Sequence, residues 1–327
     1  MNNFVNHVLE NGGNIQPLII PSEKTNGTGL MNPSILVEGD IIRVIVRHVN
    51  YTFYHSEEKL FQHQWGPLTY VHPENDMHLR TVNYYCELNE NLEMTRCDKI
   101  NTSKFDTYEP QWEFVGLEDA RIFRWNGKLY TSGVRRDLDT IGTGRMELCE
   151  IIVKEDSVEE VSRFRIPPPK DLTSYCEKNW MPILDLPNHY VKWTNPTEVV
   201  KVNPENKSCE LVSLSNQIDL PRDIRGGSQV LSSNDFYIAC THEVDLFKSE
   251  VGRKDAVYRH RFIVWDKNFN IVNYSKDFAF MDGHVEFCIG MDRYKNQILM
   301  TFGFQDNAAY VLSVPEKLIE DFINEGH

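Results

Sequence analysis

The sequence predicts an all-β fold with a short helix at each end. Three segments repeat the pattern of an apolar strand, a polar turn and a second apolar strand: 34–46, 122–130 and 262–272. The middle segment turns at Asn126-Gly127, and Asn-Gly between β-rich stretches is a hairpin signal. Many successive hairpins are typical of a β-propeller or a β-sandwich, and the lack of a clean repeat of about 40 residues leaves both open.

Both ends of the chain have the apolar spacing of a helix. Four apolar residues recur at this spacing between Phe4 and Leu9, and Gly12-Gly13 follows as a helix stop. Residues 316–324 place four apolar side chains on one face. Two stretches, 55–81 and 165–180, are predicted to be long loops, which compact domains use as functional lids or oligomer contacts. A homo-oligomer is therefore one expectation.

The composition argues against several classes of partner. The 327 residues carry a formal net charge of −14 and include 41% hydrophobic residues, as in an ordinary globular protein. This acidic balance argues against nucleic acid or an anionic membrane as the main partner, since both favour a basic surface. The sequence has no stretch of about 18 apolar residues and no secretory signal at its start, so we expect a cytoplasmic protein.

The cysteines and histidines do not form a metal-binding pattern. The seven cysteines are scattered without a C-x-x-C pair, which argues against a disulfide framework or a structural zinc site. The histidines of the first long loop lack the H-x-x-x-H spacing of a zinc site: His55, His63, His72 and His78. We therefore expect no metal, no bound cofactor, and reduced, mostly buried cysteines.

Acidic residues gather at 116–121, directly before the strand that turns at Asn126-Gly127. Glu118 and Asp119 follow a glycine and precede Arg121. A strand end of this kind can hold a general acid next to charged groups that shift its pKa. An ordinary salt bridge between Asp119 and Arg121 would explain the same residues, and this stretch alone leaves both interpretations open.

Further polar groups lie at the ends of other predicted strands. Asn32, Ser34 and Arg47 flank the first hairpin and offer donors and acceptors for sugar hydroxyls. A group of cations could hold phosphate or carboxylate, or could pair with neighbouring acids: Arg135, Arg136, Arg145 and Lys178, the last followed by Asn179. The remaining groups are Arg225 before Gly226-Gly227, His242-Glu243, Tyr258 to Arg261, and Asp306.

In this order the motifs resemble glycoside hydrolase family 130, five-bladed β-propeller enzymes that include β-mannoside phosphorylases and β-1,2-mannosidases, together with related inverting mannosyltransferases. The resemblance runs over roughly residues 30 to 312. It rests on these matches: Asn32-Pro33-Ser34, Arg47, 116–121 for Gly-x-Glu-Asp-Pro-Arg, Lys178-Asn179, 226–228 for a Gly-rich turn, 241–244 for Tyr-His-Gly-Val, and 302–306 for Tyr-Gly-x-x-Asp. The departures are Ala120 for Pro, Glu243 for Gly and Gln229-Val230 for Pro-Pro, and they leave the substrate and acceptor undecided.

The resemblance implies one five-bladed β-propeller catalytic domain over residues 1–327, with Asp119 as the general acid. It implies that the sugar is held by the matching polar residues: Asn32, Ser34, Arg47, Glu118, Arg121, Lys178, Asn179, His242 and Asp306. Five cationic or imidazole side chains are the candidates for holding phosphate: Arg135, Arg136, Arg145, Lys178 and His242.

The leading expectation is inverting phosphorolysis of a β-mannoside to mannose 1-phosphate, with inorganic phosphate as co-substrate. Hydrolysis is an alternative and would need a carboxylate base, for which Glu118 and Glu243 are the candidates. A third option is transfer from a sugar nucleotide. A propeller that binds glycans without catalysis is the non-enzymatic alternative.

Overall fold

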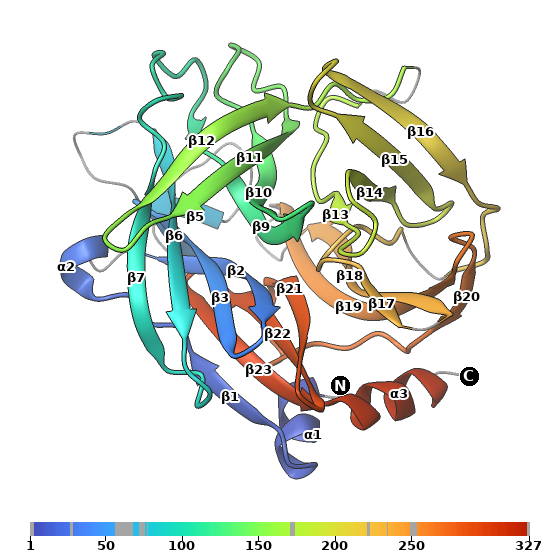
Figure 1. Cartoon of the computed structure of the whole chain (residues 1–327). Helices are drawn as coiled ribbons and strands as arrows, with labels where there is room; N and C mark the ends of the chain where they lie inside the picture. The colour runs from blue at the N-terminus through green and yellow to red at the C-terminus, as the bar shows by residue number, and fades with distance from the viewer. Residues whose placement is uncertain are drawn as a thin grey trace.

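A computed structural model describes residues 3–26, 29–55, 68–71, 76, 78–170, 174–220, 223–233, 235–248 and 254–325. Its strands form five blades around a central axis (Figure 1). The predicted β-propeller is therefore confirmed, and the β-sandwich is excluded.

Blades I and II form one continuous sheet. From the axis outward, blade I consists of β2 (Leu30–Glu38), β3 (Ile41–Val49), β6 (Leu79–Leu88) and β7 (Met94–Asn101). Blade II consists of β9 (Glu118–Trp125), β10 (Lys128–Arg135), β11 (Arg145–Val153) and β12 (Val158–Arg165). The outer strands β7 and β12 meet in a short parallel ladder, and β8 (Phe114–Val115) pairs with the start of β6.

Blades III to V complete the ring. Blade III consists of β13 (Met181–Pro182), β14 (His189–Trp193), β15 (Glu198–Asn203) and β16 (Ser208–Leu214). Blade IV consists of β17 (Leu231–Ser233), β18 (Phe236–Lys248), β19 (Lys254–Asp266) and β20 (Ile271–Tyr274). Blade V consists of β21 (Glu286–Tyr294), β22 (Gln297–Phe304), β23 (Ala308–Pro315) and the N-terminal β1 (Asn14–Pro17). Strands from both ends of the chain share blade V, and their antiparallel pairing closes the ring.

The hydrophobic core is divided into clusters between neighbouring blades. Five of the clusters each contain side chains from two neighbouring blades, for example Val46 and Val311, Ile45 and Ile122, Trp125 and Tyr190, Val199 and Trp265, and Phe262 and Phe302. Each blade therefore buries both faces against its neighbours, which explains why its strands are rich in β-branched and aromatic residues.

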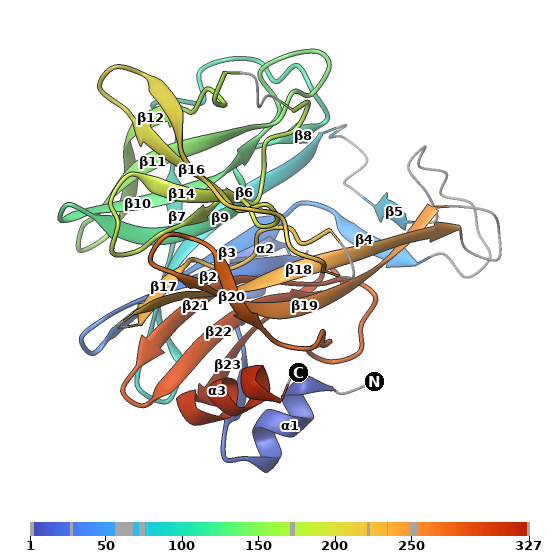
Figure 2. The same cartoon turned by 90° about the vertical axis from the view of Figure 1, so that its right-hand side faces the viewer.

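The two predicted terminal helices are confirmed, and one further turn of helix is present: α1 (Phe4–Glu10), α3 (Glu316–Asn324) and α2 (Ser22–Thr25). α1 and α3 lie together below blades IV and V (Figure 2), and Phe4 and Phe322 share one hydrophobic cluster. A Cβ atom at Gly13 would come within 2.3 Å of Val8 Cγ1, which explains the glycine after α1. In the described part of the chain, no helix is long and apolar enough to cross a membrane.

The three predicted hairpins are confirmed as β2–β3, β9–β10 and β19–β20. Asn126 and Gly127 both have positive φ, 49° and 77°, as a two-residue hairpin turn of this type requires. The turn places β9 in register with β10, with Trp125 opposite Lys128.

The prediction of a continuous loop over 55–81 is wrong in part. β4 (Thr52–His55) and β5 (Leu68–Val71) form a two-stranded ribbon, and β6 already begins at Leu79. The ribbon projects on the same side of the molecule as the far ends of β18 and β19 (Figure 2). His63 and His72 lie outside the described residues, and the residues described contain no cluster of three potential metal ligands.

The stretch 165–180 is irregular where it is described, as predicted. Its one bridge joins Cys176 to Gly144. A Cβ atom at Gly144 would come within 2.4 Å of the Cys176 sulfur, so this glycine allows the two segments to meet.

Candidate active site

Asp119 is the second residue of β9, and its carboxylate lies against the strands of blade I. Its Oδ1 atom accepts a hydrogen bond from Asn32 Nδ2 at 2.8 Å and another from Arg47 NH1 at 2.9 Å. The side chain of Asp119 is 14% exposed, so a ligand can reach it. The structure thus brings together three of the residues that the sequence placed in one site.

Arg47 holds both members of the Glu-Asp pair. Its NH2 group donates to Glu118 Oε2 at 3.0 Å, while NH1 donates to Asp119. NH2 also donates to Tyr51 Oη at 3.3 Å, and Nε donates to Thr81 Oγ1 at 3.1 Å. One buried guanidinium thus donates hydrogen bonds to four acceptors, and this geometry makes Arg47 a positioning residue for the two carboxylates. Tyr51 and Thr81 could not be predicted as partners of Arg47, because neither lies in a recognisable motif.

Two predicted sugar ligands are buried in the scaffold instead. Ser34 is fully buried, and its hydroxyl donates to the carbonyl of Ala120 at 2.7 Å and accepts from the amide of Ile122 at 3.0 Å. Its hydroxyl therefore ties β2 to β9, and the prediction of a sugar contact is wrong because no face of it reaches a ligand.

Arg121 is also fully buried, which contradicts its predicted contact with sugar. Its Nε atom donates to the carbonyl of Gly227 at 2.8 Å, and NH1 donates to the backbone carbonyl of Asp119 at 3.0 Å. Burial lowers the pKa of Arg121 to about 10, against the opposing effect of Asp119. The arginine ties blades II and IV together below the Asp119 carboxylate.

Four residues of the predicted site have a left-handed backbone conformation. Their φ angles are 42° at Asn32, 53° at Asp119, 61° at Asn179 and 49° at Asp306. Asn and Asp tolerate this region better than other non-glycine residues, and such conformations cluster at functional sites. The four residues come from different blades, so the strain is concentrated where the blades converge.

Asp306 lies in the turn between β22 and β23, close to the Asp119 group. Burial and the negative charges of Asp119 and Glu118 raise the pKa of Asp306 to about 6, although Arg47 opposes the shift. Gly303 just before the turn is in tight contact with Asn32, since a Cβ atom there would lie 2.3 Å from Asn32 Oδ1. This close approach accounts for the glycine of the closing motif.

The pKa values of the two acids of the site, Asp119 and Asp306, are shifted in opposite directions. Burial alone would raise the pKa of Asp119, but Arg47, the Asn32 amide and the more distant Arg121 and Lys178 together hold it below its usual value. Asp119 is therefore ionised in the unliganded site, whereas Asp306 is half protonated near pH 6. Carboxyl pairs whose environments separate their pKa values are characteristic of acid–base sites.

His242 in β18 is a neutral imidazole. Burial, followed by the charges of His260, Arg225 and Lys178, lowers its pKa well below the usual value. Nδ1 lies 2.8 Å from the carbonyl oxygen of Gly226, so this nitrogen carries the proton and Nε2 keeps its lone pair. The ring stacks on Tyr258 with a centroid separation of 5.6 Å.

Lys178 and Arg225 are two cations whose charges act on the titratable groups of the site. Lys178 affects the pKa of both Asp119 and His242, and Arg225 affects that of His242 and Tyr258. Within the described residues, neither cation is paired with a carboxylate. Asn179 beside Lys178 is buried, and its Oδ1 atom has no hydrogen-bond partner among the described residues.

Arg136 and Arg145 support the segment that carries Lys178. Arg136 donates to the carbonyl of Gly142 at 3.0 Å and to Tyr175 Oη at 3.3 Å, and Arg145 NH1 contacts the carbonyls of Gly144, Ser174 and Tyr175. Neither arginine forms an ion pair with a described carboxylate, so both keep an uncompensated positive charge beside the segment that carries Lys178.

Arg135 belongs to a different environment, and its predicted role in phosphate binding is wrong. It is 2% exposed and forms ion pairs with Glu147 at 2.9 Å, Asp137 at 3.3 Å and Asp106 at 3.3 Å. Three carboxylates compensate its charge, which removes the reason to bind an anion.

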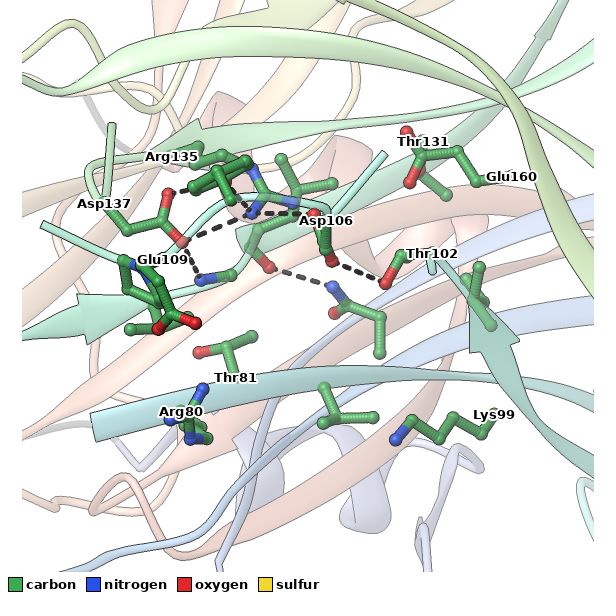
Figure 3. A pocket seen from close by; sticks show the side chains of 18 residues that line it. Arg80, Thr81, Lys99, Thr102, Asp106, Glu109, Thr131, Arg135, Asp137 and Glu160 are labelled. Carbon is green, nitrogen blue, oxygen red and sulfur yellow. Dashed lines mark hydrogen bonds and ion pairs between the residues drawn. The ribbon is translucent and has the colours of Figure 1, made fainter. Parts of the chain in front are cut away.

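Arg135, Asp106 and Asp137 line a cavity of about 420 Å³ between blades I and II (Figure 3). Asp137 accepts a hydrogen bond from the amide of Gly116 at 3.0 Å. Gly116 has a φ angle of 103° and immediately precedes the Leu117-Glu118-Asp119 sequence. The buried ion pairs of Arg135 therefore fix the backbone conformation just before Asp119, the candidate general acid.

No protein-family model and no curated protein sequence matches the chain. Solved structures do match it over nearly their whole length. A β-1,2-mannobiose phosphorylase from Listeria innocua has a TM-score of 0.56 at 11% identity, with coverage of 95% of this chain and 97% of that one. The chain has the fold of this enzyme.

Two other solved structures also share the fold of this chain. A mannose phosphorylase from Leishmania mexicana, in complex with phosphate ion, has a TM-score of 0.54 at 13% identity and covers 96% of this chain and 93% of its own. A structure reported for glycoside hydrolase family 130, described as mannoside phosphorylases that include hydrolases of β-1,2-mannosidic linkages, has a TM-score of 0.52 at 12% identity and covers 88% and 85%. The propeller fold inferred from the motif order is thus shared with these structures.

Proposed function

We propose that this protein is an inverting glycoside phosphorylase that converts a β-mannoside and phosphate into mannose 1-phosphate. One observation carries the proposal: an accessible carboxylate, Asp119, lies among cations that no described carboxylate neutralises, chiefly Lys178 and Arg225. The fold shared with mannoside phosphorylases supports the choice of sugar.

In this reaction a phosphate oxygen attacks the anomeric carbon from the face opposite the glycosidic oxygen. The bond to the glycosidic oxygen breaks, and that oxygen takes the proton of Asp119, directly or through a sugar hydroxyl. Asp119 is left ionised, which is the form that Arg47 and Asn32 stabilise. Asn32 and Asp306 remain the candidates for orienting the sugar ring.

Phosphate binding would also prepare the acid. Lys178 helps to keep the pKa of Asp119 low in the unliganded site. A phosphate dianion beside Lys178 would offset that charge and add its own, so it would raise the pKa of Asp119. The proton donor would then be protonated mainly when the nucleophile is bound. Lys178, Arg225, Arg136 and neutral His242 are the proposed phosphate ligands, and Arg145 holds the segment that leads to Lys178 through the carbonyls of Ser174 and Tyr175.

Of the two candidate bases for hydrolysis, Glu118 is as exposed as Asp119, at 15%, whereas Glu243 is out of reach of water. Glu243 is 1% exposed and accepts from Arg261 Nε at 2.7 Å, and Glu118 is bound to Arg47. A carboxylate that activates water needs access to it, and Glu243 has none.

The test is to incubate the protein with β-1,2-mannobiose, with and without inorganic phosphate. Mannose 1-phosphate should form only with phosphate, and Asp119→Asn should reduce the rate by at least about 100-fold, as expected for loss of a general acid. Free mannose released without phosphate would favour a hydrolase. Thermal stabilisation by a mannose nucleotide but not by mannose 1-phosphate would favour a transferase. A glycan-binding protein would show no activity before substitution, and Asp119→Asn would leave its ligand binding unchanged.

A further inference from the structure

Two cysteines of blade I face each other on its outer strands. Cys86 in β6 and Cys97 in β7 are direct partners in the antiparallel register. Direct partners in such a ladder have Cα atoms about 4.5 or 5.5 Å apart, and disulfides span Cα separations of about 4.4–6.8 Å. The sheet therefore already holds the two residues at a distance that a disulfide can bridge.

The two thiols have different environments. Cys86 is fully buried and Cys97 is partly exposed. A hydrogen bond from the Cys86 thiol lowers the pKa of Cys97, and the nearby Lys24 ammonium acts in the same direction. Lys24 is fixed there, because its Nζ atom donates to the carbonyl of Cys97 at 2.6 Å. A partly exposed thiol with a lowered pKa beside a second thiol is the arrangement found in redox-reactive cysteine pairs.

The other cysteines lack this combination. Cys176 and Cys209 are also partly exposed, but burial raises the pKa of both, to about 12 for Cys209. Neither lies opposite a cysteine in the described strands. Cys240 and Cys288 contact each other through their thiols, but both are fully buried, so an oxidant cannot reach them.

We propose that Cys97 and Cys86 form an oxidation site in which a hydroperoxide converts the two thiols into a disulfide. With hydrogen peroxide, the Cys97 thiolate attacks one oxygen, the O–O bond breaks, and hydroxide leaves, which produces a sulfenic acid. The Cys86 sulfur then loses its proton and attacks the Cys97 sulfur, and the displaced hydroxide takes up a proton as water. In total, two thiols and one peroxide give one disulfide and two waters.

The test is to treat the full-length protein with hydrogen peroxide and to map its peptides without reduction. The expected product is an intramolecular link between the Cys86 and Cys97 peptides, with the number of free thiols falling from seven to five. The disulfide encloses a short loop, so the oxidised protein should melt a few degrees higher than the reduced protein. Dithiothreitol should reverse both changes.

Two variants separate the steps. Cys86→Ser should leave Cys97 as a sulfenic acid that dimedone traps, and Cys97→Ser should keep all six of its thiols under the same treatment. The Cys240–Cys288 pair is the internal control and should stay reduced. Oxidation of Cys176 or Cys209 before Cys97, or a protein that keeps seven thiols, would overturn the proposal. This experiment does not depend on the glycoside chemistry proposed above.

Discussion

Replacement of Arg47 by lysine tests whether the guanidinium fork, rather than positive charge alone, holds the Asp119 site. Arg47 donates hydrogen bonds to Thr81, Tyr51, Glu118 and Asp119. A lysine ammonium is a single donor centre on a flexible chain and cannot reach these four acceptors from one position. Arg43→Lys is the matched control, because Arg43 lies on the same strand and pairs with the carboxylate of Glu38.

The expected magnitude follows from the contacts that lysine cannot make. A hydrogen bond to a charged group contributes about 1.5–3 kcal/mol, and Arg47→Lys loses at least two of them. The retained positive charge still attracts Asp119 and Glu118, so we expect the free energy of unfolding to fall by about 3 kcal/mol. Arg43 is closer to solvent, so Arg43→Lys should cost less than about 1 kcal/mol.

The loss of orientation should also reduce the rate. Asp119 would keep its charge partner but lose the fixed direction of its carboxylate, and misplacement of a catalytic group by about 1 Å can cost about 100-fold in rate. Urea unfolding and steady-state phosphorolysis measure the two effects on both variants. If Arg47→Lys and Arg43→Lys have the same stability and the same kcat, the fork does not position the acid and the reasoning is wrong.

Three other substitutions test separate parts of the site. The pKa of Asp306 is raised to about 6, so ionisation of its carboxyl group destabilises the fold as the pH rises through 6. Asp306→Asn should therefore raise the melting temperature at pH 8 but not at pH 4. Equal shifts at the two pH values would contradict this. Asp137→Asn should lower the free energy of unfolding by about 2 kcal/mol in urea, since Arg135 loses one of its carboxylates and Gly116 a charged acceptor. Lys178→Ala should raise the KM for phosphate at least about 10-fold with a smaller change in kcat, and an unchanged KM would remove Lys178 from the phosphate site.

The local parts of this fold could be predicted from the sequence. Helix spacing located α1 and α3, and the Asn126-Gly127 turn located the β9–β10 hairpin, because these patterns act over a few neighbouring residues. The order of motifs along the chain also indicated a propeller whose blades converge on Asp119. The β4–β5 ribbon was missed, since each strand has only four residues and twelve residues separate the two strands.

The roles of individual charged residues required the tertiary structure. Arg135 and Lys178 look equally suited to an anion in the sequence. In the structure, Asp106, Asp137 and Glu147 neutralise Arg135, and only Asp137 is its close neighbour in the chain, whereas no described carboxylate neutralises Lys178. Ser34 likewise looked available for sugar until β9 was seen to use its hydroxyl. The sequence determines which groups exist and which strands they occupy. Only the packing of blades decides which partners compensate them, because charge pairing and burial depend on residues far apart in the chain.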